Sequence, residues 1–82
     1  MTEDNFAAGM FVLSKAGRDK NRIHLVVKTE DDYVYIVDGE TRKIEKPKKK
    51  KKKHVLLLDC PAYDGVMSNR ALKKKICEMT TV

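Results

Sequence analysis

The chain has 82 residues, of which 41% are hydrophobic and 37% are charged, and its formal net charge at pH 7 is +6. This length allows one small domain and leaves little room for a deep active-site cleft. The apolar fraction argues against a purely disordered tail and for a folded domain with a charged surface.

The positive charge is concentrated in two separate stretches of the chain. Residues 42–53 contain nine basic residues and one acid, and residues 9–29 contain five basic residues and one acid. Between them, residues 30–41 contain five acids and no base. A fold that brings the two basic stretches onto one face would create a surface that attracts a polyanion.

Residues 1–7 are predicted to form a flexible leader. The opening stretch, MTEDNFAAG, lacks the basic region and long apolar run of a secretory signal. No window of the chain approaches the 18 apolar residues of a membrane span. These features predict a cytoplasmic protein with no membrane partner, in which Cys60 and Cys77 are reduced thiols.

Two strands joined by a basic loop are predicted next. The stretch GMFVLSKAG, residues 9–17, begins with an apolar run and ends at a glycine, which predicts a short strand that leads into a turn. Residues 18–22 are all polar and predict a loop. Residues 23–29, IHLVVKT, are rich in β-branched side chains and predict the second strand, with a turn at residues 30–32.

The dipeptide Asp38-Gly39 is the clearest local signal. It stands between a β-rich arm and a second arm of alternating character, and Asp-Gly supplies the positive φ angles of a type I′ turn. Residues 33–45 are therefore predicted to form a tight β-hairpin, with Val34 and Ile36 on one face of its first arm.

Pro47 and the six lysines Lys48–Lys53 follow the predicted hairpin. Like charges repel, proline has no N–H to donate, and no apolar face is evident here. Residues 46–54 are therefore predicted to be a mobile basic loop. The next stretch, HVLLLD, predicts a last strand at residues 54–59, and its consecutive apolar residues predict that both of its faces are covered.

A helix is predicted over residues 68–79, after a loop at residues 60–68. Ser68 is a suitable N-cap, and one apolar stripe is formed by Leu72, Ile76 and Met79. A helix this short is not stable alone in water and must dock on the rest of the protein. The outer face of the 54–59 strand is the expected partner.

These elements predict a mainly β fold with a C-terminal helix. Five short strands with tight connections favour a small, partly closed barrel over residues 8–59. Residues 60–82 would then form a loop and the helix that packs on the barrel.

Enzymatic patterns are absent from the sequence. No glycine-rich phosphate loop is present, and Asp31-Asp32 falls in a predicted turn. His24 lies inside a strand pattern, which predicts a packed ring. No zinc motif spacing relates His24, His54, Cys60 and Cys77. We therefore expect neither catalysis nor a metal or other cofactor.

The basic residues predict binding to nucleic-acid phosphates. Lysine is a flexible point charge that suits phosphate and reads base edges poorly, whereas arginine can also fork onto phosphate. Few aromatic residues are present, so recognition through shape and backbone is expected in preference to base stacking. The predicted RNA contacts are Lys15, Arg18, Lys20, Arg22, Arg42, Lys43, Lys46, Lys48, Lys49, Lys50, Lys51, Lys52, Lys53 and His54.

The stretch GMFVLSKAGRDKNRIHLVV resembles the KOW motif, in which a strand, a glycine-containing basic loop and a second strand begin an SH3-like barrel. The matching positions are Gly9, Val12, Gly17 and Val26-Val27. One departure is Asn21, which replaces the second loop glycine. Asparagine tolerates left-handed backbone geometry, so the KOW turn at Gly17 and Asn21 is expected to survive.

The rest of the barrel, DDYVYIVDGETRKIEKPKKKKKKHV, resembles bacterial KOW-type RNA-binding proteins. These are similar to the archaeal and eukaryotic large-subunit ribosomal protein family numbered fourteen. The resemblance covers residues 8–77 and implies a five-stranded SH3-like barrel, monomeric when free. It also implies binding to structured RNA, in particular ribosomal RNA, through the 14–22 loop and the neighbouring basic segment, with ribosomal proteins as further partners.

Two other interpretations remain open at this point. SH3-like barrels also bind peptides, so the domain could serve as a protein-interaction module in transcription or translation. The stretch PKKKKKK resembles a nuclear import signal, an interpretation that applies only if the source is eukaryotic.

Overall fold

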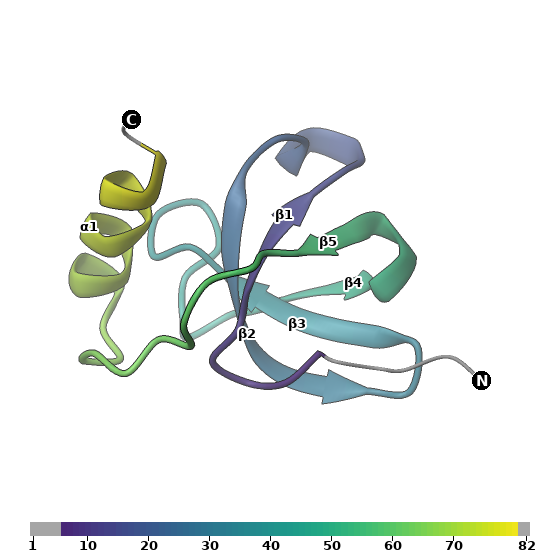
Figure 1. The fold of residues 1–82 in the computed structure, drawn as a ribbon, viewed down its shortest axis with the longest axis horizontal. Helices are drawn as coiled ribbons and strands as arrows, with labels where there is room; N and C mark the ends of the chain where they lie inside the picture. Colours follow the sequence, from purple (N-terminus) through teal and green to yellow (C-terminus); the bar gives the residue numbers. More distant parts are fainter. Residues whose placement is uncertain (1–5, 81–82) are drawn as a thin grey trace.

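A computed structural model describes residues 6–80, so residues 1–5 of the predicted leader lie outside the described part. The chain forms a five-stranded sheet followed by one helix (Figure 1). In chain order the elements are β1 (Phe11–Ser14), the 3-10 helix η1 (Gly17–Asp19), β2 (Ile23–Glu30), β3 (Tyr33–Val37), β4 (Lys48–Lys51), the 3-10 helix η2 (Lys52–His54), β5 (Val55–Leu57) and α1 (Asn69–Thr80). The predicted mainly β fold with a C-terminal helix is confirmed.

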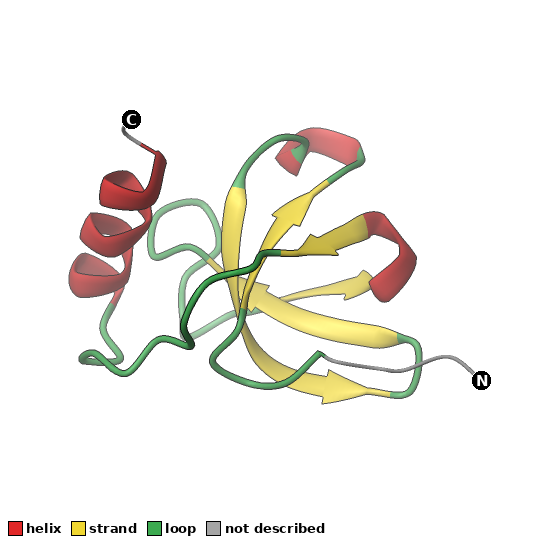
Figure 2. Ribbon diagram, in the orientation of Figure 1, coloured by secondary structure: helices red, strands yellow, loops and turns green. Residues whose placement is uncertain are grey.

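All strand pairs of the sheet are antiparallel, and the order is β4-β3-β2-β1-β5. The strands β4 and β5 therefore lie at the two ends of this order, although only η2 separates them along the chain. Helix α1 lies at one end of the molecule (Figure 2). The 3-10 helix η1 connects β1 to β2, and η2 connects β4 to β5.

The core has two parts because successive residues of β1 and β2 point to opposite faces. One cluster is formed by Val12, Val26, Val34, Ile36 and Val55. The other is formed by Phe11, Leu25 and Val37 together with Leu72 of α1. Both faces of the central strands are thus covered. Val34, Ile36 and Val55 of the other strands cover one face, and α1 covers the other.

Helix α1 begins and packs as its sequence predicts. The Ser68 hydroxyl accepts a hydrogen bond from the Ala71 N–H at 3.2 Å, which is the expected N-cap. Leu72 is fully buried, and Ile76 and Met79 pack against the same cluster. The apolar stripe is therefore the docking face.

The prediction that the helix packs on the outer face of the 54–59 strand was largely wrong. Helix α1 packs on Phe11, Leu25 and Val37, with Leu58 only at the margin of this cluster. On the three-residue strand β5, Leu56 stays 50% exposed, so the expectation that both faces of this strand are covered was also wrong. The physical reason is that the central strands β1 and β2 offer a wider apolar surface than an edge strand.

The loop after β3 fixes the N-terminus of α1. Ile44 N–H donates to the Asn69 side-chain oxygen at 2.8 Å, and the Asn69 amide donates to Glu45 at 2.8 Å. Gly39 has φ +82 and packs so closely that a Cβ there would overlap the Asn69 carbonyl. Glycine at this position therefore serves helix docking.

The predicted type I′ hairpin at Asp38-Gly39 does not form. The carboxylate of Asp38 accepts hydrogen bonds from the N–H groups of Glu40 and Arg42, both at 2.8 Å, and so organises a wider loop. The predicted second arm, residues 41–45, consists of bends and turns. The two-residue turn of the sheet instead lies at Asp31-Asp32, between the paired residues of β2 and β3.

Candidate nucleic-acid interface

The lysine run is a strand and not the mobile loop that its charge predicts. Four of its residues form β4, which pairs with β3 in the register Ile36–Lys48, Tyr35–Lys49, Val34–Lys50 and Tyr33–Lys51. The ladder satisfies backbone groups, and the apolar stems of lysines cover neighbouring side chains while their charged heads reach water. The ammonium of Lys49 makes a further contact, because its Nζ lies 4.4 Å from the centre of the Tyr33 ring. The strand holds the charges at fixed positions.

Lys50 points inward from β4 and joins this strand to the first basic loop. It lies opposite Val34, on the side of the core, and its side chain is only 9% exposed. Its ammonium donates to the Ala16 carbonyl at 2.8 Å and lies 3.8 Å from Asp19. Lys50 is therefore a positioning residue, because its charge is already engaged inside the protein.

Asp19 is the centre of the arrangement, and the sequence analysis missed it. It is only 3% exposed although it lies in the basic loop. Besides Lys50, it accepts a hydrogen bond from the Arg42 guanidinium at 3.2 Å. One buried carboxylate of the first basic stretch thus holds two cations, Arg42 and Lys50, of the second basic stretch.

The electrostatics of Asp19 follow from these neighbours. Burial raises the pKa of its carboxyl, but the hydrogen bond and charge of Arg42, together with the charges of Lys50 and of His24 when it is protonated, outweigh burial. The pKa therefore lies below its ordinary value. The carboxylate is therefore ionised at neutral pH and can act as the common counter-charge.

Two further bonds bring the remaining basic segments together. The Lys15 N–H donates to the His54 carbonyl at 2.8 Å, which attaches the end of β1 to η2. The Arg22 guanidinium donates to the Thr41 hydroxyl at 3.4 Å, which links the first loop to the segment that contains Arg42. The residues around positions 15–22, 41–43 and 48–54 are consequently parts of one surface.

The tip of the first loop has the backbone geometry that the KOW resemblance implies. Gly17 has φ +77 and Asn21 has φ +70, so asparagine does occupy the left-handed region at this turn. The Asn21 N–H donates to the Ser14 carbonyl at 2.7 Å and closes the loop. Arg18 and Lys20 remain exposed at its tip.

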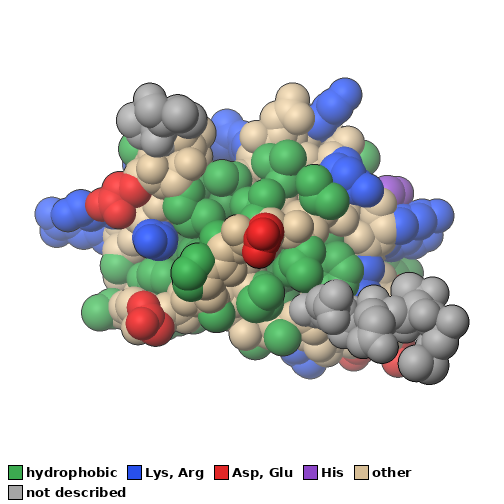
Figure 3. Space-filling model, in the orientation of Figure 1, with side chains coloured by type: hydrophobic (Ala, Val, Ile, Leu, Met, Phe, Trp, Pro, Cys, Tyr) green, Lys and Arg blue, Asp and Glu red, His purple; other side chains and the backbone are tan. Residues whose placement is uncertain are grey.

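Most of the predicted contact residues are accessible. Four are partly buried: Arg42, Lys50, Lys52 and His54. The others are exposed: Lys15, Arg18, Lys20, Arg22, Lys43, Lys46, Lys48, Lys49, Lys51 and Lys53. In Figure 3, blue side chains project from the end of the molecule opposite α1, with further lysines on the helix itself. The exposed set is the candidate interface.

A fully buried polar cluster supports this surface from below. The Ser14 hydroxyl and Nδ1 of His24 lie 3.2 Å apart and share a hydrogen bond. Nε2 of His24 lies 3.7 Å from Asp38 and 4.0 Å from Asp19, beyond hydrogen-bond distance. Burial lowers the pKa of His24 although the two carboxylates raise it, and the net shift is downward. The ring is therefore neutral at neutral pH and packed, as its strand pattern predicts.

This cluster contains a serine, a histidine and an aspartate, but it has no access to a substrate. Ser14 and His24 are both completely buried, and Asp38 is engaged with loop N–H groups. A nucleophile needs room for a reacting group within about 3 Å. The cluster orders the two loops above it.

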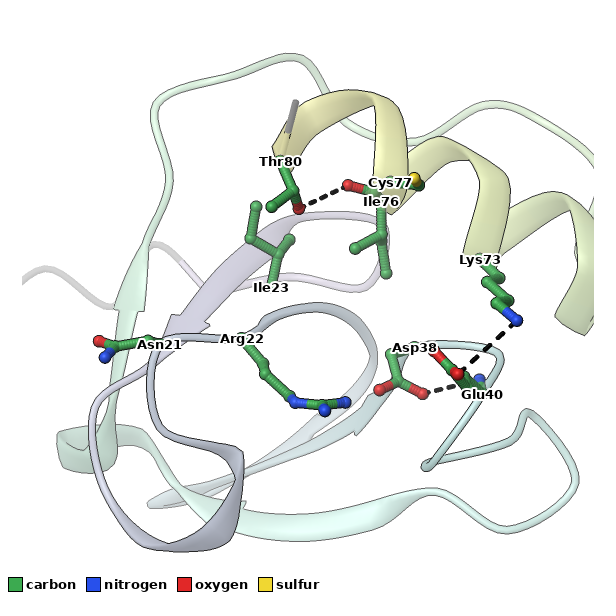
Figure 4. A pocket seen from close by; sticks show the side chains of 9 residues that line it. All are labelled: Asn21, Arg22, Ile23, Asp38, Glu40, Lys73, Ile76, Cys77 and Thr80. Atoms are coloured by element: carbon green, nitrogen blue, oxygen red, sulfur yellow. Dashed lines mark hydrogen bonds and ion pairs between the residues drawn. The ribbon is translucent and has the colours of Figure 1, made fainter. Parts of the chain in front are cut away.

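A cavity of about 330 Å³ lies between the first basic loop and α1 (Figure 4). Arg22 and Lys73 line it, but so do Asp38 and Glu40. The ammonium of Lys73 lies 3.6 Å from the Glu40 carboxylate. The charge of Lys73 in this cavity is therefore balanced locally by Glu40.

Comparison with protein-family models and with curated proteins gives no match. Within residues 6–80, no helix has the length and apolar character required to cross a membrane. The same part of the chain holds no group of three or more His, Cys, Asp or Glu side chains placed to bind a metal ion.

Proposed function

We propose that the protein binds structured RNA by gripping its phosphate backbone with the exposed basic side chains of residues 15–22, 42–46 and 48–54. The observation that carries this proposal is the convergence of these segments through Asp19, which bonds Arg42 and lies beside Lys50. Asp19 neutralises part of the positive charge inside the protein, at Arg42 and Lys50. This reduces the repulsion among the remaining cations, so they can lie close together. Such a cluster binds a polyanion chiefly by releasing counterions.

The proposal includes an SH3-like barrel of the KOW type as the scaffold. Four Cα steps join Lys51 at the end of β4 to Val55 at the start of β5, a reach of about 14 Å. The two edges of a flat five-stranded sheet would lie about 19 Å apart. The sheet must therefore curl until its edge strands approach each other, which supports the partly closed barrel.

The choice of RNA and of the translation machinery rests on the KOW resemblance. We propose a cytoplasmic role on ribosomal RNA, with ribosomal proteins as neighbours and without a catalytic step. A surface made of lysine point charges suits such binding to phosphates. Fixed phosphate spacing along a duplex suits lysines held by a strand, since such contacts position a protein without reading sequence.

A salt titration tests the proposed function. We expect the binding constant for a ribosomal RNA stem-loop to fall linearly with salt on logarithmic axes. Each phosphate contact should contribute about 0.7 to 0.9 to the slope, so six contacts would give a slope of about −4 to −5. Filter binding between about 50 and 200 mM salt measures this. A flat dependence, or no binding at low salt, would exclude the electrostatic mechanism.

Peptide binding is the second candidate, and one observation favours it. The edge strand β5 exposes half of Leu56, and an exposed edge can accept another strand. Replacing the five lysines at positions 48, 49, 51, 52 and 53 by glutamine, with Lys50 kept because it supports the fold, separates the candidates. RNA binding would collapse, whereas binding through Leu56 would survive.

A further inference from the structure

The outer face of the sheet carries two tyrosines set among lysines. Tyr33 lies opposite Lys51, and Tyr35 lies between Lys28 and Lys49 in the register of β2, β3 and β4. The alternate residues of β3 are fully buried in the core, so this row faces outward. The sequence analysis did not assign these rings to the interface.

The lysines already contact the tyrosine rings. Nζ of Lys49 lies 4.4 Å from the centre of the Tyr33 ring, and Nζ of Lys28 lies 5.3 Å from the centre of the Tyr35 ring. The Tyr35 hydroxyl donates to Glu30 at 2.9 Å, which holds this ring in place. Two aromatic rings, each with a lysine ammonium over it, are therefore present on one face.

We propose that this face binds unpaired nucleotides of the RNA, with bases stacked on Tyr33 and Tyr35 and phosphates beside Lys28, Lys49 and Lys51. The inference rests on the proposed function and narrows its substrate to RNA in which a single strand adjoins a duplex. Residues two apart on a strand are separated by about 7 Å, twice the rise of about 3.4 Å between stacked nucleotides. The rings can thus receive two successive bases of an extended strand.

Charge complementarity and continuity identify the occupant. Strand β4 belongs to both surfaces, because Lys50 reaches the first basic loop whereas Lys49 lies over Tyr33 on the other face. A single strand of RNA that leaves the duplex can cross β4 and reach the two tyrosines. Its phosphates then stay close to lysines along the whole path. An arriving base displaces the ammonium from the ring to its own phosphate, and stacking is the stronger contact at an exposed site.

Acidic groups beside the tyrosines limit where the RNA strand can run on this face. Glu30 lies 3.7 Å from Lys49, and the hydrogen bond from Tyr35, followed by nearby lysine charges, keeps the pKa of its carboxyl below the usual value. Glu30 is therefore ionised and, with Asp31 and Asp32 of the adjacent turn, repels phosphate. The bound strand is therefore expected not to continue past Tyr33 over the Asp31-Asp32 turn.

The test compares a blunt RNA hairpin with the same hairpin carrying a short uridine tail at either end. We expect the wild type to bind one tailed hairpin at least about tenfold more tightly than the blunt one. The Tyr33→Leu, Tyr35→Leu variant should lose this preference while it keeps its affinity for the blunt hairpin. The matched Tyr33→Phe, Tyr35→Phe variant keeps both rings and should keep the preference.

The outcomes separate this inference from the proposed function. Binding to both hairpins without any tail preference overturns the stacking face alone, and binding to neither overturns both proposals. A second measurement needs no substitution: 4-thiouridine in the tail should crosslink on irradiation to Tyr33 or Tyr35 of the wild type. Crosslinks confined to other parts of the chain would overturn the inference.

Discussion

Replacing Lys15, Lys20 and Lys53 by glutamine is expected to weaken binding to a structured RNA by tenfold or more at low salt, or roughly one logarithmic unit. These lysines are exposed and come from the first loop and from η2, which meet where the Lys15 N–H donates to the His54 carbonyl. If all three contact phosphates, the slope of log K against log salt should become shallower by about 2 to 3. Filter binding over a range of salt concentrations measures both quantities.

The helix offers a control of equal charge. Replacing Lys73, Lys74 and Lys75 by glutamine removes the same number of exposed positive charges from α1, at the opposite end of the molecule (Figure 1). This variant should keep most of the affinity and nearly the wild-type slope. Equal losses in both variants would mean that the RNA responds to net charge and not to the converged surface.

Asp19→Asn is expected to lower the free energy of unfolding by about 3 kcal/mol, at the lower end of the cost of breaking a buried ion pair, because the Arg42 side chain is 27% exposed and partly screened by water. The amide would leave Arg42 and Lys50 without their shared counter-charge. For a small domain with about 5 to 15 kcal/mol of stability this is a large loss. Urea unfolding followed by circular dichroism measures it.

The exposed aspartate Asp64 provides the matched control. Asp64→Asn makes the same chemical change in a loop and should alter stability by no more than about 0.5 kcal/mol. If Asp19→Asn were equally mild, the buried carboxylate would not be the organising group of the interface.

Acid should reduce the difference between the wild type and Asp19→Asn. The folded-state pKa of Asp19 lies below its ordinary value, so its contribution is complete above about pH 4 and is lost as the pH falls through the folded pKa. The lowered pKa of His24 also destabilises the fold as the pH falls below about 6.5, and Asp19 is one of the carboxylates that raise this pKa. The comparison is therefore made below about pH 4, where the Asp19 carboxylate itself takes up a proton. A stability difference that stays constant down to about pH 2 would contradict the role assigned to the Asp19 charge.

The parts of the fold that were predictable are those where local and tertiary preferences agree. Alternating apolar residues in β2 and β3, and the Ser68 cap with the Leu72 stripe of α1, indicate the same structure at both levels. The lysine run differs because repulsion between neighbours favours a loop, whereas pairing with β3 and the stacking of lysine on Tyr33 favour a strand. These stabilising contacts come from β3, at least eleven residues earlier in the chain, and a local pattern does not contain them.

The candidate site was predictable in its charges and not in its organisation. The basic residues stand out in the sequence, but an aspartate within a basic loop gives no sign that it is buried. Asp38 was interpreted as a turn residue, although its carboxylate binds two loop N–H groups. One available signal was the alternation in β3, which places Tyr33 and Tyr35 opposite the buried residues and therefore outward.

The most direct test of the central claim is an NMR titration of ¹⁵N-labelled protein with an RNA hairpin, followed through the backbone amide shifts. The account predicts that residues 15–22 and 48–54 shift together, with one binding curve, while residues 69–80 of α1 change little. Shifts centred on α1 or on the exposed side chains Leu56, Val66 and Met67, with the two basic segments unchanged, would contradict it.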